Sequence, residues 1–275
     1  MVERNPWDGD QADGLRRLFG SRAPQVVAFA SGREACGRTT LVVQTAAALA
    51  AAGHGVVVVD ENPAPDNTLA AFGLGGGRHD FFNVVRGDRP LAQIAVKAAP
   101  LVRIVPAARA AREFDHLDLN GFQRLAAGLR DIQRGASFVL IDSANRRAGR
   151  LSAIAASARH VAVVVAAQGQ AITHAYALIK RIAQDYGRDH FQIVVTRARS
   201  GDEAQAVFDN MRRVAREHIG VRLDYLGAAA VPVTEHLAEA LLHRLPAIAD
   251  AADIGGLVPS SLETGRRPGL VDSVL

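Results

Sequence analysis

Cysteine is nearly absent from this 275-residue chain, in which Cys36 is the single example. One thiol excludes a disulfide within the chain and a metal cluster held by several cysteines of the same chain. Lysine is almost as rare, since Lys97 and Lys180 stand against thirty arginines. No stretch approaches the roughly 20 apolar residues that a membrane-spanning helix needs. The polar, acidic start also lacks the apolar segment of a secretory signal, so we expect a cytoplasmic protein.

Concentrated charge is missing as well. The formal net charge is +4 and the isoelectric point is near 9.8, but no run of five or more basic residues gathers that charge in one place. A basic surface without such a run does not identify a partner. We therefore do not expect nucleic-acid binding.

Short apolar runs that alternate with helix-like segments occupy most of the sequence. Strands without polar alternation are predicted at residues 26–30, 56–60, 102–105, 138–142, 161–166 and 192–196, with a weaker one at 222–227. Helical spacing of apolar residues predicts helices at 39–52, 119–135, 174–186 and 202–219. The pattern predicts an α/β fold, with a mostly parallel twisted sheet of about seven or eight strands and helices on both faces.

The first predicted strand runs into a glycine-containing loop and then an alanine-rich helix. This segment matches the phosphate-binding pattern GxxxxGK[ST], with arginine in place of the lysine. Backbone N–H groups of such a loop, together with the helix dipole, favour bound phosphate. We assign phosphate contacts to Gly32, Cys36, Gly37, Arg38, Thr39 and Thr40.

Two further strands end on an acidic residue, Asp60 and Asp142. Carboxyl ends of parallel strands share one edge of a sheet, where ligands of such folds bind. Carboxylates and a loop hydroxyl are suitable ligands for magnesium. We therefore expect Thr39, Asp60 and Asp142 to hold Mg²⁺ with a bound nucleotide.

Together these segments resemble the MinD/ParA branch of P-loop ATPases over residues 26–247. That family combines a KGGxGKT loop, a D-x-D segment and a hydrophobic strand that ends in aspartate. The resemblance implies binding of ATP or ADP with Mg²⁺, and it places Thr196 and Arg197, in a segment like the family's VVNRA, near the base.

Several positions depart from the family pattern. Arg33 replaces the signature lysine, Arg38 replaces the phosphate-loop lysine, and Asn62 replaces the second aspartate of D-x-D. Arginine is not equivalent to lysine at a phosphate, and an amide cannot accept a proton at neutral pH. Glu34 and Ala35 stand where glycines are usual. We predict weak nucleotide binding and slow or absent hydrolysis.

An N-terminal segment contains Asp10, Gln11, Ala12, Leu15 and Arg16, which match the motif DQAxxLR. This motif narrows the resemblance to the FlhG/FleN family of flagellar-number regulators. In that family the segment forms a helix that stimulates an FlhF-type GTPase. Flagellar switch-complex proteins, a flagellar transcription activator and a nucleotide-dependent homodimer are further implied partners.

The expected organisation is a partner-binding helix and linker (1–24), a nucleotide-binding domain (25–258) and a tail (259–275). The last seven residues, with four apolar side chains, would bind lipid weakly at the inner face of the membrane. Two alternatives remain. An active MinD/ParA-like ATPase for partition or division-site placement would have intact lysines and D-x-D, and an iron–sulfur carrier of this fold would need interface cysteines.

Overall fold

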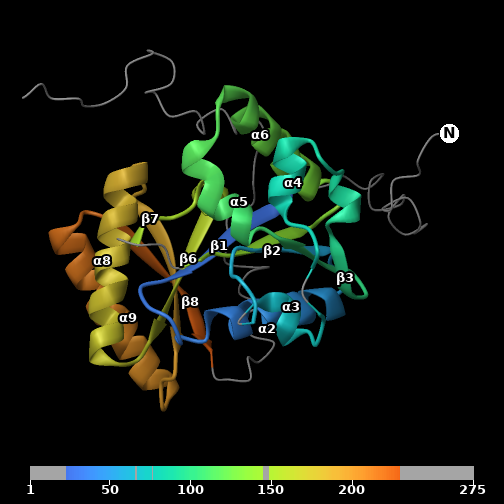
Figure 1. Cartoon of the computed structure of the whole chain (residues 1–275). Coiled ribbons are helices and arrows are strands. Elements are labelled where there is room, and N and C mark those ends of the chain that lie inside the picture. Colours follow the sequence, from blue (N-terminus) through green and yellow to red (C-terminus); the bar gives the residue numbers. More distant parts are fainter. Residues whose placement is uncertain (1–22, 66, 76, 145–148, 230–275) are drawn as a thin grey trace, which may run out of the picture.

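The computed structural model describes residues 23–65, 67–75, 77–144 and 149–229. They form one eight-stranded sheet with the order β3-β4-β2-β5-β1-β6-β7-β8 (Figure 1). The strands are β1 (Gln25–Ser31), β2 (Val56–Asp60), β3 (Val96–Ala99), β4 (Val102–Pro106), β5 (Phe138–Asp142), β6 (His160–Ala166), β7 (His190–Thr196) and β8 (Arg222–Ala229). Every neighbouring pair is parallel except β3 and β4. The predicted fold class is confirmed.

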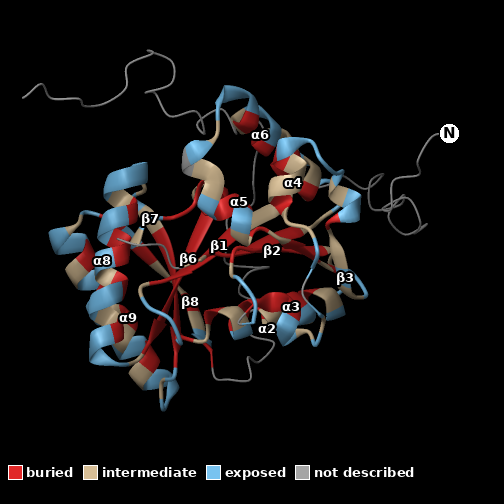
Figure 2. Ribbon diagram, viewed as in Figure 1, coloured by how far each residue is buried: buried red, intermediate tan, exposed pale blue. Residues whose placement is uncertain are grey.

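Helices cover both faces of this sheet. They are α2 (Arg38–Ala51), α3 (Thr68–Ala71), α4 (Phe81–Arg86), α5 (Ala108–Glu113), α6 (Leu119–Gln133), α7 (Ala153–Ala156), α8 (Gly169–Tyr186) and α9 (Gly201–His218), with 3-10 turns at Leu91–Gln93 and Phe114–His116. Residues of α2 and α3 pack in one core cluster together with Ala171 of α8, and residues of α4 to α9 pack in the other. Figure 2 shows the buried strands between exposed outer helix surfaces. No helix within the described ranges is long and apolar enough to span a membrane.

Seven strands were predicted from the sequence within a few residues of their bounds. The eighth, β3, was missed because its sequence VKAA is short, half-exposed and not an apolar run. Helix α8 begins at Gly169, earlier than the predicted start at residue 174. The true start was missed because no capping side chain marks the first turn in the sequence. The short helices α3, α4, α5 and α7 span too few residues for an apolar period to be visible.

Candidate nucleotide-binding site

The loop between β1 and α2, together with the first turn of α2, is called the phosphate loop here (residues 32–39). Two of its residues are left-handed, Gly37 with φ 81° and Ala35 with φ 60°. Residues of this kind curve the backbone so that successive N–H groups form an anion-binding concavity. The loop therefore keeps an anion-binding shape although alanine occupies a glycine position, at a conformational cost of about 1–2 kcal/mol.

Gly32 lies directly against helix α8. A Cβ atom built on Gly32 would come within 2.4 Å of the carbonyl carbon of His174 and within 2.7 Å of the Ala175 nitrogen. Backbone atoms cannot move aside like a flexible side chain. The absence of a side chain at this position is thus required by packing, in addition to the phosphate role predicted from the motif.

The middle of the phosphate loop is fixed to the core. Cys36 is 3% exposed, and its thiol donates to the Arg33 carbonyl oxygen at 3.4 Å. The Thr196 hydroxyl at the end of β7 donates to the Cys36 carbonyl oxygen at 2.9 Å. Thr196 thereby positions the loop, while exposed Arg197 follows it with φ 58°. Their predicted contacts with the base stay predictions.

The Arg38 side chain is directed back toward the strand ends. Its Nε donates to Asp142 Oδ1 at 2.5 Å, and its terminal nitrogens donate to Ser31 Oγ at 3.1 Å and Asn62 Oδ1 at 2.8 Å. Arg38 is 8% exposed and Asp142 is fully buried. A buried carboxylate needs such a partner, because an uncompensated charge in the interior is very costly. The arginine that replaces the motif lysine is therefore an internal ion-pair partner.

Both acidic strand ends already accept several hydrogen bonds. Asp142 Oδ2 accepts from the Thr39 hydroxyl at 2.7 Å. Asp60 Oδ2 accepts from the backbone N–H and the hydroxyl of Thr68, each at 2.7 Å, and its Oδ1 accepts from Asn62 N–H at 3.0 Å. Burial raises the pKa of Asp60, whereas the Thr68 hydrogen bond acts in the opposite direction.

These oxygen atoms are of the type that Mg²⁺ prefers. However, the Arg38 guanidinium donates to one oxygen of Asp142 and the Thr39 hydroxyl donates to the other, so an ion there would have to displace a protein donor. The arrangement thus fits phosphate at the loop but does not fit a magnesium ion beside Asp142.

Asn62 is held at both ends of its amide. Its Nδ2 donates to the Asp142 carbonyl oxygen at 3.2 Å while its Oδ1 accepts from Arg38. The sequence analysis placed Asn62 where the family has an aspartate that positions water. Here the side chain ties β5 to the phosphate loop, and an amide has no lone pair basic enough to take a proton.

Glu61 is a residue that the sequence reasoning missed. It is 1% exposed, and its carboxylate accepts from the Ala144 N–H at 3.0 Å and from the Ser152 hydroxyl. Burial raises its pKa to about 7, against the opposing effect of those hydrogen bonds. Glu61 thus connects the end of β2 to the segment after β5. A charged residue directly beside a strand-end aspartate was the available signal.

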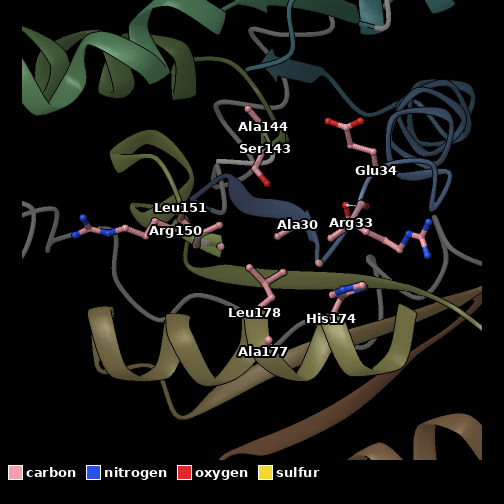
Figure 3. Close-up of a pocket in the computed structure, with 13 residues that line it drawn as sticks. Ala30, Arg33, Glu34, Ser143, Ala144, Arg150, Leu151, His174, Ala177 and Leu178 are labelled. Atoms are coloured by element: carbon pink, nitrogen blue, oxygen red, sulfur yellow. Dashed lines mark hydrogen bonds between the residues drawn. The ribbon is translucent and has the colours of Figure 1, made fainter. Parts of the chain in front are cut away.

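A cavity of about 480 Å³ lies beside the phosphate loop (Figure 3). The outer part of the loop, the segment after β5 and helix α8 form its walls. In Figure 3 Leu178 points inward from α8, whereas Arg33 and Arg150 extend away on opposite sides. The lining residues with polar or charged side chains are Ser31, Arg33, Glu34, Ser143, Arg150 and His174.

The described site residues from the sequence analysis therefore gather at the carboxyl ends of β1, β2, β5 and β7. They are Gly32, Arg33, Cys36, Gly37, Arg38, Thr39, Thr40, Asp60, Asn62, Asp142, Thr196 and Arg197. The five residues of the N-terminal motif (10–16) and the tail (259–275) lie outside the described residues. Their roles, and the division into 1–24, 25–258 and 259–275, stay predictions.

Comparison with known proteins agrees with this geometry. Residues 27–247 match the CobQ/CobB/MinD/ParA nucleotide binding domain, which covers most of the chain, so the protein belongs to this family. The antiactivator FleN of Pseudomonas aeruginosa is 29% identical over 226 residues, which are 82% of this chain and 80% of FleN. The resemblance stated from the motifs is thereby confirmed.

Two solved structures illustrate the shared fold. MinD of Aquifex aeolicus is 19% identical with a TM-score of 0.57, over 79% of this chain and 86% of that protein. A putative plasmid partition protein of Borrelia burgdorferi bound to AMPPNP is 12% identical with a TM-score of 0.62, over 82% of this chain and 100% of that one. At these identities the likeness concerns the fold alone.

Proposed function

We propose that this chain is a flagellar-number regulator of the FlhG/FleN kind, which binds an adenine nucleotide weakly and acts by contacting partners. The observation that carries the proposal is the Arg38 side chain, which pairs with Asp142 and Asn62 inside the site. Membership of the nucleotide-binding family supports the proposed binding of nucleotide. The similarity to the antiactivator FleN supports the proposed regulatory role.

Slow or absent hydrolysis follows from the same contacts. Catalysis of phosphoryl transfer depends on charges placed around the transferring group and on an oriented water. Here the motif arginine is engaged with Asp142, and the water-positioning aspartate is replaced by Asn62. The shape of the phosphate loop supports binding, whereas these substitutions argue against turnover.

Fluorescent ATP binding combined with a phosphate-release assay on the full chain tests this part. We expect saturable binding with turnover far below that of an active MinD/ParA ATPase. Asp142→Ala serves as the comparison variant. If the wild type turns over at the rate of an active family member and Asp142→Ala abolishes this turnover, the chain is an active ATPase and our proposal is wrong.

The partner-directed part concerns residues 10–16. We propose that this segment binds an FlhF-type GTPase and stimulates its hydrolysis of GTP. The test adds the full chain, its Gln11→Ala variant, or a peptide of residues 2–22 to the GTPase. Stimulation by the chain and the peptide that Gln11→Ala weakens is the expected result. The absence of stimulation by both contradicts this role.

The remaining assignments form part of the same proposal. We place the protein in the cytoplasm, with flagellar switch-complex proteins and a flagellar transcription activator as further partners and a homodimer that forms with nucleotide. Contact of the residues 269–275 with lipid is weak, because four apolar residues bury little area. Pelleting with anionic liposomes should therefore retain only a minor fraction of the protein. Strong pelleting would contradict this.

A further inference from the structure

The Arg38 guanidinium lies at the meeting point of three strand ends. It contacts Ser31 at the end of β1, Asn62 just beyond β2 and Asp142 at the end of β5, at 3.1, 2.8 and 2.5 Å. Its neighbour Thr39 donates to the other oxygen of Asp142. The positive charge of Arg38 therefore lies directly beside Asp142, one of the three residues predicted to hold a metal ion.

The charge balance of this cluster depends on Arg38. Asp142 is fully buried, and the Arg38 side chain is only 9% exposed. A divalent cation beside Asp142 would have to displace the guanidinium from Oδ1 or approach a like charge within a few ångströms. The first change breaks a buried hydrogen-bonded ion pair, and the second is repelled strongly in a poorly solvated site.

The second carboxylate does not offer an alternative position. Asp60 is 2% exposed, and both of its oxygens accept hydrogen bonds from Asn62 and Thr68. Asn62 links Asp60 to the Arg38–Asp142 ion pair, since its amide contacts both Asp60 Oδ1 and the Arg38 guanidinium. The acids are thus satisfied by protein donors and by one permanent positive charge.

We propose that Arg38 is the resident cation of this site and takes over the role of Mg²⁺, so that nucleotide phosphate binds without a divalent ion. Arginine stays protonated at all relevant pH values, and its charge is fixed in the first turn of α2. The backbone concavity around Ala35 and Gly37 supplies the N–H donors in front of it. This inference rests on the proposed nucleotide binding.

The first arm of the test measures binding of fluorescent ATP to the full chain with excess magnesium and with EDTA. We expect the wild-type affinity to change by less than about twofold, because Arg38 supplies the charge. Arg38→Lys, a smaller cation, should regain the metal requirement and lose about tenfold or more in EDTA. A tenfold loss for the wild type in EDTA overturns the proposal.

The second arm uses Mn²⁺ alone and does not depend on nucleotide binding. Free Mn²⁺ is followed by electron paramagnetic resonance with the wild type and Arg38→Gln, which keeps much of the side-chain length without the charge. We expect saturable binding of about one ion by the variant and none by the wild type. Mn²⁺ binding by both proteins, or by neither, overturns the proposal.

Two controls separate the possible failures. Arg216→Gln, an exposed arginine on α9, should match the wild type in both arms. Circular dichroism verifies that Arg38→Gln is folded, and Arg38→Met, which also lacks the charge, replaces it in the Mn²⁺ arm if it is not. If fluorescent ATP fails to bind under every condition, the proposed nucleotide binding is wrong, and the Mn²⁺ arm alone decides whether Arg38 excludes the metal.

Discussion

The two halves of the phosphate loop are held in different ways. Residues 32–35 contain three consecutive exposed residues, Arg33, Glu34 and Ala35, beside the cavity. Residues 36–39 include buried Cys36 and Arg38, and they are hydrogen-bonded to the ends of β1, β5 and β7 and to Asn62 just after β2. Both halves depart from the family motif, and in the second half the departing residue, Arg38, is hydrogen-bonded to the strand ends.

This difference separates two kinds of substitution. A change in the second half alters the charge balance of the core, so the residue must be compatible with Asp142. A change at the exposed positions of the first half alters what the protein presents to a phosphate or to another protein. We therefore expect the second half to govern stability and the first half to govern recognition.

Replacing Arg38 by alanine should have the largest effect. It leaves the fully buried Asp142 without its cation, and removal of one partner of such a pair costs about 3–5 kcal/mol of the free energy of unfolding. Arg33→Ala, at the exposed position in the first half, should cost less than about 0.5 kcal/mol. Urea denaturation of the two variants measures both values. Equal losses would remove the distinction between the halves.

Gly32→Ala tests the one point where the first half is tightly packed. The added methyl group meets the backbone of His174, and overpacking of this kind costs about 1–3 kcal/mol. Gly169→Ala is the matched control, since a Cβ atom there has no neighbour within 4 Å. Thermal and urea unfolding should show a loss for the first variant and little change for the second. An unaffected Gly32→Ala would contradict the close approach.

Glu61 controls the segment after β5 that faces the first half across the cavity. Its pKa is raised to about 7 in the folded state, so between its ordinary pKa and pH 7 the folded protein binds more protons than the unfolded one. Stability contributed by this group therefore falls as pH rises through that window, and the loss ends above pH 7. Relative to the wild type, Glu61→Gln should gain about 3 kcal/mol over that range.

The measurement is urea denaturation of both proteins at several pH values from 5 to 8. Using the difference between the two proteins removes the contributions of other groups, including His160, whose pKa is lowered to about 4 by burial. A difference that does not change with pH would show that Glu61 is already ionised in the folded protein.

Ala35→Gly should produce the smallest effect, and in the stabilising direction. Glycine removes the strain of a left-handed alanine but loses more conformational entropy on folding, which leaves a gain of about 0.5–1 kcal/mol. Differential scanning calorimetry can detect this change. Ala50→Gly, within helix α2, should be destabilising by a similar amount. A loss of stability in Ala35→Gly would contradict the strained conformation.

Much of the fold was readable because the central strands are continuous apolar runs. The same logic located the site, since Asp60, Asp142 and Thr196 all end parallel strands and must lie at one edge of the sheet. What could not be read was the direction of a side chain after the backbone had assembled. From the sequence, Arg38 could equally well have extended past Asp142 without touching it, and their contact joins residues 104 positions apart.

Two other features were hidden for similar reasons. The buried environment of Glu61 depends on Ala144 and Ser152, which reach it only through the fold. The close contact at Gly32 depends on where α8 crosses the loop. Both are properties of packing between distant segments, which a local pattern does not encode.

The contact between Gly32 and α8 has a mechanical consequence. Backbone touches backbone there, without an intervening side chain whose rotamer could absorb a displacement. A shift of the helix toward the loop must therefore displace the loop by a comparable distance. The solvent-exposed residues of α8 include Thr173 and Lys180. A partner that pushes α8 toward the loop should therefore also shift the phosphate-binding backbone at Gly32.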